Sequence, residues 1–124
     1  MKLRIQGNLL RLRLTQKEVA LLRDHRPVES AIQFPSRRAL SYSLASSPNA
    51  AEVTAEYEND SVRIVVPREV AIAWAESSEV TIAGPTDSSI QILIEKDFQC
   101  LHKSAEQEPD AYPNPLAAVK QSAG

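Results

Sequence analysis

The feature that most constrains the fold of this chain is a pattern that occurs twice. Residues 10–34 read LRLRLTQKEVALLRDHRPVESAIQF, and residues 62–84 read VRIVVPREVAIAWAESSEVTIAG. Each segment has an alternating stretch typical of a strand, a helix start followed by Glu-Val-Ala, one short helix and a returning strand. A chain with such a duplication is predicted to fold as two similar units.

The flanking segments complete each unit as strand, strand, helix, strand, strand. The predicted elements of the first unit are residues 2–5, 9–14, 16–24, 28–34 and 39–45. Those of the second unit are residues 51–58, 61–66, a short helix that starts at Pro67, 79–82 and 89–98. Because one unit buries its sheet poorly alone, we expect both to share one core. The predicted fold class is α+β and β-rich, a small barrel or sandwich capped by two short helices.

Local signals indicate where the helices begin and which side chains are buried. Thr15 and Glu18 form a capping box, in which the threonine oxygen accepts a backbone N–H and the glutamate reaches back. Pro67 suits the first helical position, where its missing N–H costs nothing. Val70 and Trp74 are predicted to face the core as a pair. The side chains predicted to be buried are Leu10, Leu12, Leu14, Val19, Leu22, Val62, Ile64, Val66, Val70, Trp74, Ile90, Ile92, Ile94 and Phe98.

The composition is that of an ordinary globular protein, with 43% hydrophobic and 24% charged residues. We expect one domain over residues 1–102, made of pseudo-repeats at about 1–46 and 51–100. The single cysteine, Cys100, cannot form an internal disulfide, so no oxidising compartment is needed. No apolar run approaches the roughly 20 residues of a membrane span. We therefore expect a cytoplasmic protein without a membrane segment.

The C-terminal residues differ in composition from the rest of the chain. Residues 103–124 are small, acidic and proline-containing, which is typical of a flexible tail. Within them, residues 111–116 contain two prolines that restrict the backbone and one aromatic side chain, Tyr112. Because an aromatic ring gains by burial, we expect this segment to pack over the sheet as a strap. A short recognition segment for another protein is the alternative.

Charge is divided unevenly along the chain. Residues 1–50 contain nine Lys and Arg and three Asp and Glu, whereas residues 51–124 contain five and thirteen. Such a division can indicate a nucleic-acid surface, two halves that attract each other, or a dimer that pairs unlike faces. The acidic second half argues against nucleic acid. A homodimer or another protein partner stays open.

Reactive side chains gather in the stretch IEKDFQCLHKS, residues 94–104. If the strand continues through it, alternation places Cys100 on the apolar face and Glu95 and Asp97 on the opposite face. Cys100 is then a buried thiol of low reactivity. The stretch is interpreted as a strand end rather than as a site.

Metal and catalytic sites are hard to build from these residues. Cys100 and His102 supply two ligands, whereas a tetrahedral zinc site has four. As a nucleophile and base they would need a third group, for which the tail residue Asp110 would have to fold back. Glu95 and Asp97 could act as an acid–base pair or bind a hard cation. We expect no cofactor and no metal, and the functional candidates are Glu95, Asp97, Cys100, His102, Asp110, Tyr112 and Asn114.

Three blocks resemble an uncharacterised family of small bacterial proteins, known only as a domain of unknown function. They are MKLRIQGNLLRLRLTQKEV at residues 1–19, EKDFQCL at 95–101 and DAYPNP at 110–115. The blocks lie at both ends of the chain, and the resemblance implies no activity.

Residues 62–84 are also similar to the half-barrel of AbrB-type swapped-hairpin proteins. There a strand runs into a Pro-Arg-Glu-Val helix start and a second strand returns. That family has a glycine-containing turn after the helix, where this chain has AESSEV. Its members bind DNA as dimers through arginines, and Arg63 and Arg68 match basic positions.

We therefore expect a small non-catalytic binding or assembly module that acts through a sheet face, the basic N-terminal half or the tail. One alternative is a small-ligand or metal-binding barrel, or an enzyme, that uses Glu95, Asp97 and Cys100. The other alternative is an AbrB-like DNA-binding regulator.

Overall fold

The computed structural model describes residues 1–98 and residue 112. The described residues form eight strands and two helices. In chain order these are β1 (Lys2–Gln6), β2 (Leu9–Leu14), α1 (Gln16–Arg23), β3 (Val28–Gln33), β4 (Ala39–Ser47), β5 (Thr54–Glu58), β6 (Ser61–Pro67), α2 (Arg68–Ala75), β7 (Thr81–Ala83) and β8 (Gln91–Lys96). The fold is α+β and mostly strand, and it consists of the two β-β-α-β-β units that the sequence predicts.

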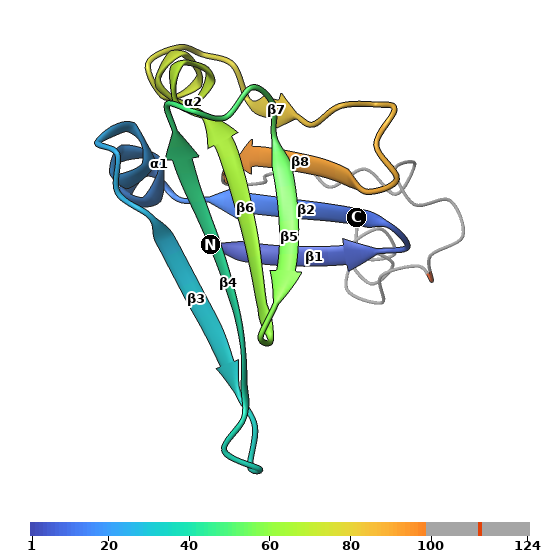
Figure 1. The fold of residues 1–124 in the computed structure, drawn as a ribbon. Helices are drawn as coiled ribbons and strands as arrows, with labels where there is room; N and C mark the ends of the chain where they lie inside the picture. Colours follow the sequence, from blue (N-terminus) through green and yellow to red (C-terminus); the bar gives the residue numbers. More distant parts are fainter. Residues whose placement is uncertain (99–111, 113–124) are drawn as a thin grey trace, which may run out of the picture.

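The strands form two four-stranded sheets that lie against each other with their strands crossing (Figure 1). One sheet has the order β1-β2-β8-β7 and the other has the order β3-β4-β6-β5. Each unit therefore gives one hairpin to each sheet, and the hairpins meet through the parallel pairs β2–β8 and β4–β6. The sheets do not close into a barrel, so the observed architecture is the sandwich.

The strand registers show that the two units are built alike. In one sheet Leu12 of β2 is opposite Ile94 of β8, and in the other Ile64 of β6 is opposite Leu44 of β4. All four side chains are buried. Each helix has eight residues and follows the second strand of its unit. The second unit thus repeats the first with the two sheets exchanged.

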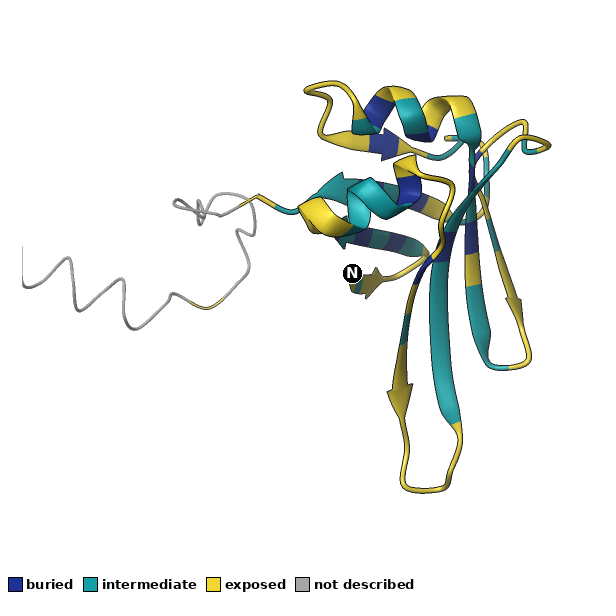
Figure 2. Ribbon diagram, turned by 90° about the vertical axis from the view of Figure 1, so that its left-hand side faces the viewer, coloured by how far each residue is buried: buried dark blue, intermediate teal, exposed yellow. Residues whose placement is uncertain are grey.

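The core lies where the two sheets cross and beneath the helices, which contact each other at one end of the sandwich (Figure 1). Figure 2 shows that the far ends of the β3–β4 and β5–β6 hairpins are not buried. Burying a large aliphatic side chain contributes about 1.5–3 kcal/mol. The predicted core residues confirmed as buried are Leu10, Leu12, Leu14, Leu22, Ile64, Val66, Trp74, Ile92 and Ile94.

The two tight hairpins turn through residues with positive φ. Gly7, between β1 and β2, has a φ of 54°, which glycine adopts without strain. Asn59 and Asp60, between β5 and β6, have φ values of 53° and 60°. A two-residue loop with both φ angles positive is the type I′ turn, whose twist matches that of the flanking strands. The hairpin turn predicted at Asn59-Asp60 is confirmed.

The helix starts agree with the sequence in one unit and differ in the other. At α1, the Glu18 N–H donates to Thr15 Oγ1 at 3.3 Å, and the Thr15 N–H donates to Glu18 Oε1 at 2.9 Å, so the capping box is confirmed. Pro67, by contrast, is the N-cap of α2 and not its first helical residue. It ends β6 in an extended conformation, with φ −54° and ψ 134°.

Two predicted core residues are exposed. Val70 is 43% exposed because α2 begins one residue later than predicted. That shift turns Ala71 and Trp74 toward the core, three residues apart. Phe98 is 62% exposed because β8 ends at Lys96, so the alternation of faces does not extend to it.

Candidate functional site

Glu95 and Asp97 lie at the end of β8, on the face of the sheet that points away from the core. Glu95 Oε1 is 3.3 Å from Arg11 Nε and 3.6 Å from Arg13 Nε, both on the adjacent strand β2. Asp97 Oδ2 is 3.1 Å from Lys2 Nζ. The prediction that the two carboxylates share a face away from the core agrees with this arrangement.

These ion pairs determine what the two carboxylates can do. The Glu95 side chain is 21% exposed and lies beside two guanidinium groups. A general acid or base, or a ligand of a hard cation, needs an oxygen directed at a substrate or an ion. The arrangement therefore favours a structural role, in which Glu95 and Asp97 join β8 to β1 and β2.

The remaining predicted site residues lie mostly outside the described part of the chain. Cys100, His102, Asp110 and Asn114 belong to this set, so the predicted buried thiol stays a prediction. Tyr112 is described, and it is 99% exposed. Because the rest of the segment 111–116 lies outside the described residues, the strap stays a prediction. Within residues 1–98 and 112, no three His, Cys, Asp or Glu side chains gather in a way that could hold a metal ion.

A groove of about 540 Å³ lies beside this strand end, between α1, the end of α2 and the end of β8. We name it the α1–α2 groove. One stripe of α1 forms a wall, and the residues after β8 form the opposite border. The lining side chains that matter for its chemistry are Gln16, Val19, Ala20, Arg23, Lys96 and Phe98. The groove is thus lined by apolar side chains and by polar ones, among which are the cations Arg23 and Lys96 and the carboxylate of Asp97.

Lys96 is the most firmly held of these cations. Its Nζ donates to the Ser77 carbonyl oxygen at 2.7 Å and lies 5.4 Å from the centre of the Trp74 ring. Trp74 itself is buried and donates from Nε1 to the Val80 carbonyl oxygen at 3.0 Å. The ammonium group is therefore fixed at the end of α2 by a hydrogen bond and a cation–π contact.

The corresponding position of the second unit is occupied by a side chain. Arg68 begins α2 as Gln16 begins α1, and Ser46 on β4 corresponds to Lys96 on β8. The Arg68 guanidinium donates to Ser46 Oγ and to the Ser46 carbonyl oxygen, each at 3.4 Å. The fold can therefore cover this position with an arginine, and the first unit has a glutamine there.

A second surface feature is the free edge of β3. The edge strands are β1 and β7 in one sheet and β3 and β5 in the other. Natural edge strands are guarded against pairing by charge or by short length. β1 carries Lys2 and Arg4, β5 carries Glu56 and Glu58, and β7 has only three residues.

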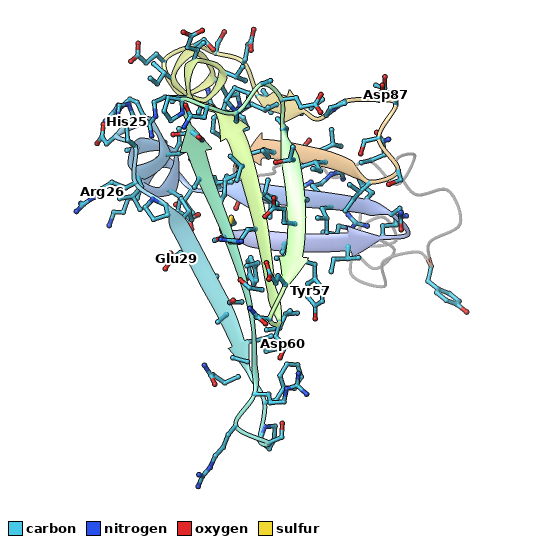
Figure 3. The ribbon with its side chains drawn as sticks, in the orientation of Figure 1. His25, Arg26, Glu29, Tyr57, Asp60 and Asp87 are labelled. Atoms are coloured by element: carbon cyan, nitrogen blue, oxygen red, sulfur yellow. The ribbon has the colours of Figure 1, made fainter. Side chains whose placement is uncertain are left out.

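β3 is guarded least among these four edges. It has six residues and one charged side chain, Glu29, which lies at the outer border of the sheet (Figure 3). Ile32 is 51% exposed, and Phe34, directly after the strand, is 48% exposed. An uncharged, partly apolar edge of this length is a favourable place for strand addition.

The hydrogen bonding of β3 identifies which backbone groups point outward. The Phe34 N–H donates to the Arg38 carbonyl oxygen at 2.8 Å, across the β3–β4 hairpin. Hydrogen-bonded residues alternate along an antiparallel pair. Ser30 and Ile32 therefore bond to β4, while the N–H and C=O groups of Glu29, Ala31 and Gln33 point away from it.

The hydrogen bond from Arg23 to Asp24 raises the pKa of Arg23, which lines the α1–α2 groove, and three further ionisable groups have shifted pKa values. Burial of Glu18 raises its pKa, but hydrogen bonds from the Met1 amino group and from Thr15 outweigh burial, so the pKa is lowered overall. The hydrogen bond between Arg38 and Asp60 lowers the pKa of Asp60 and raises that of Arg38. Asp60 lies in the β5–β6 turn (Figure 3), and this exposed pair joins that turn to the β3–β4 loop. These shifts are explained by local structure.

The two arginines carried over from the AbrB-type resemblance also have partners. Arg63 Nη2 is 3.5 Å from Glu56 Oε2 on β5, and Arg68 bonds to Ser46 as described above. Cations that contact phosphate must present their donors to the nucleic acid. Arg68 is held against β4, and the carboxylate beside Arg63 opposes a phosphate, so neither contact favours the DNA-binding alternative.

Neither the α1–α2 groove nor the β3 edge was predicted from the sequence. The groove forms where residues from α1 and β8 meet, which are more than 70 residues apart in the chain. For the edge a signal existed, because VESAIQF lacks the lysine and arginine of β1 and the two glutamates of β5. That signal becomes readable only once the order of strands in the sheet is known.

Comparisons with known proteins identify the family of the chain but indicate no activity. Within the described part of the chain, no helix has the length and apolar character needed to cross a membrane. A search of curated proteins and a search of solved structures found no match. One family model covers residues 1–116, which is nearly the whole chain, and it confirms the resemblance to a domain of unknown function. The chain belongs to the family of unknown function DUF7009.

Proposed function

We propose that this protein is a non-catalytic assembly module of the cytoplasm, which forms a homodimer by pairing β3 with β3 of a second copy. The observation that carries the proposal is the unguarded β3 edge, with three outward-facing backbone residues and exposed apolar side chains. Antiparallel addition of one strand would join two four-stranded sheets into one of eight strands.

The sequence of β3 is suited to pairing with itself. A two-fold axis through Ala31 places Ala31 opposite Ala31 of the partner subunit. It also places Glu29 opposite Gln33 of the partner subunit, and both residues have outward backbone groups. The glutamine amide can donate to the carboxylate, which is a favourable cross-strand pair. No like charges face each other in this register.

The same register covers the exposed apolar groups. Phe34 would lie opposite Val28 of the partner subunit, and Ile32 opposite Ser30 of the partner subunit. Phe34 and Ile32 are 48% and 51% exposed in the single chain. Removing them from water adds a hydrophobic contribution to the backbone hydrogen bonds.

A non-catalytic role is supported by the state of the reactive groups within residues 1–98. Glu95 and Asp97 are held in ion pairs with Arg11, Arg13 and Lys2. An enzyme would need such groups free to meet a substrate, whereas Asp97, which lines the α1–α2 groove, is paired with Lys2. The composition, with its single cysteine, supports the cytoplasm as the compartment.

The test is a pair of substitutions at Ala31, whose side chain is exposed. Ala31→Lys places two ammonium groups opposite each other at the two-fold axis, and like charges there oppose pairing. Ala31→Thr keeps the N–H and suits a strand, so it serves as the matched control. We expect the wild type and Ala31→Thr to be dimers by light scattering after size exclusion, and Ala31→Lys to be a monomer at the same concentration.

A third variant, Ala31→Pro, removes the outward N–H from each copy without removing a bond to β4. We expect it also to be monomeric, with a circular dichroism spectrum like that of the wild type. A monomeric wild type would disprove the proposal. So would a dimer that both Ala31→Lys and Ala31→Pro leave intact, because the copies would then meet elsewhere.

A further inference from the structure

We infer that the α1–α2 groove binds a small amphipathic carboxylate, a molecule with a compact apolar body and one negatively charged head. This site is independent of the β3 edge. Its volume of about 540 Å³ lies within the range of about 300–1,000 Å³ that is usual for small-molecule pockets.

The interior of the groove suits an apolar body. Val19 and Ala20 of α1 face it from one side, and Phe98 borders it with a ring that is 62% exposed. Leu14, buried at the end of β2, also lines it. A hydrocarbon chain in contact with these groups would leave water and would cover part of the Phe98 ring.

The borders of the groove suit a negative head. Lys96 and Arg23 both line the groove, Arg23 Nε is 3.2 Å from Asp24 Oδ1, and the acidic lining residue, Asp97, is 3.1 Å from Lys2. Lys96 Nζ has three donors, of which one is used on the Ser77 carbonyl oxygen. Its position is already fixed, so a carboxylate that binds it loses little additional side-chain entropy.

The comparison with the second unit indicates that folding does not require this opening. There Arg68 covers the corresponding position by donating to Ser46. The first unit has Gln16 in place of Arg68 and Lys96 in place of Ser46. Both differences leave the groove accessible and place a cation at its border, which is the combination that an anionic ligand requires.

Trp74 provides a built-in reporter, because it is the only tryptophan of the chain. Lys96 Nζ lies 5.4 Å from its ring centre, so a carboxylate bound to Lys96 changes the charge beside the indole. We expect octanoate to change Trp74 fluorescence saturably. Octylammonium has the same chain with the opposite charge, and butanoate has the same head with little chain. We expect each to bind at least about tenfold more weakly than octanoate, because octylammonium loses the charged contact and butanoate loses four methylene groups that would leave water.

Two variants test the site directly by isothermal titration calorimetry with octanoate. The double variant Gln16→Arg/Lys96→Ser reproduces the second unit and keeps the net charge. We expect it to lose octanoate binding while its unfolding midpoint stays close to that of the wild type. Lys17→Gln removes an exposed cation of α1 that does not line the groove, and we expect it to bind octanoate like the wild type.

Several outcomes would overturn the inference. One is the absence of saturable octanoate binding to the wild type. Another is equal affinity for octanoate and octylammonium, which would indicate an apolar surface without charge recognition. The third is unchanged affinity of the double variant, which would place octanoate elsewhere. Light scattering on the same samples shows separately whether the dimer proposal holds.

Discussion

The two β-β-α-β-β units share their topology, yet they differ in two features of the surface, the strand that follows the helix and the groove beside it. Both helices have eight residues and cap the same end of the sandwich. The strand that follows the helix has six residues in the first unit, as β3, and three in the second, as β7. The first unit therefore has a long free edge and an open groove, whereas the second has a short edge and a groove position covered by Arg68.

This difference between the units shows which features the fold requires and which it does not require. A three-residue returning strand is sufficient to complete a sheet, because β7 pairs with β8 over only three residues. The additional length of β3, and the exposed Ile32 beyond the core, contribute little to burial. Features of one unit that the other lacks are therefore the best candidates for function, and both proposals arise from the first unit.

The largest expected difference between the units concerns a buried side chain in the last turn of each helix. Leu22 and Trp74 occupy corresponding positions and are both buried. We expect Trp74→Ala to lower the free energy of unfolding by about 3–5 kcal/mol and Leu22→Ala by about 2–5 kcal/mol. The tryptophan should cost more, because its larger side chain leaves a larger cavity and because the Val80 carbonyl oxygen loses one of its two donors, keeping the Lys96 N–H.

Urea unfolding followed by circular dichroism measures both variants on the same scale. Fluorescence is unsuitable, since Trp74 is the only tryptophan. A smaller loss for Trp74→Ala than for Leu22→Ala would show that the second helix contributes less to the shared core than the first. The comparison of the units would then need revision, because the burial of the two side chains is nearly equal.

A smaller effect tests which residue of α2 corresponds to Val19 of α1. The motif Glu-Val-Ala aligns Val70 with Val19, whereas the structure aligns Ala71 with Val19. We expect Val70→Lys to change the free energy of unfolding by no more than about 0.5 kcal/mol, as at other surface sites. Ala71→Leu should cost about 1–3 kcal/mol, because Ala71 is fully buried and has no room for a larger group. If Val70→Lys lowered the free energy of unfolding more than Ala71→Leu, Val70 and not Ala71 would correspond to Val19, as the Glu-Val-Ala motif suggests.

This one-residue shift illustrates how much of the fold the sequence predicts. Alternation of leucines and arginines in β2 and the capping box at Thr15 determine strand, helix and buried face directly. Pro67 does not, because proline suits both the N-cap and the first helical residue, and the two choices differ by one position. Val70 was misplaced for that reason, and Phe98 was misplaced because β8 ends two residues earlier.

The candidate sites were less predictable than the fold. The sequence placed Glu95 and Asp97 on the outer face, which is correct, but it could not show that Arg11, Arg13 and Lys2 lie beside them. Those contacts depend on the parallel pairing of β2 with β8, whose residues are about eighty positions apart. Strand order also decides which edges are free, and short-range patterns carry no information about it.

The smallest expected effect concerns the helix caps and their dependence on pH. Thr15→Ala should lower the free energy of unfolding by about 1 kcal/mol at neutral pH, because it removes the side-chain acceptor of the capping box. The second part of the box is charged. The pKa of Glu18 is lowered below its ordinary value of 4.5, since hydrogen bonds from the Met1 amino group and Thr15 outweigh burial.

A lowered pKa means that the folded state favours the ionised carboxylate. Its contribution is therefore fully present above pH 4.5 and is lost as the pH falls through the lower folded pKa. We expect Glu18→Gln to be less stable than the wild type at pH 7 and to approach it as the pH falls below 4.5. Glu69→Gln, in the first turn of α2, is the control, because α2 starts without a side-chain cap hydrogen bond. Its difference from the wild type should be small at both pH values. If the losses of stability in Glu18→Gln and Glu69→Gln depend on pH in the same way, the capping box is not what distinguishes the two helix starts.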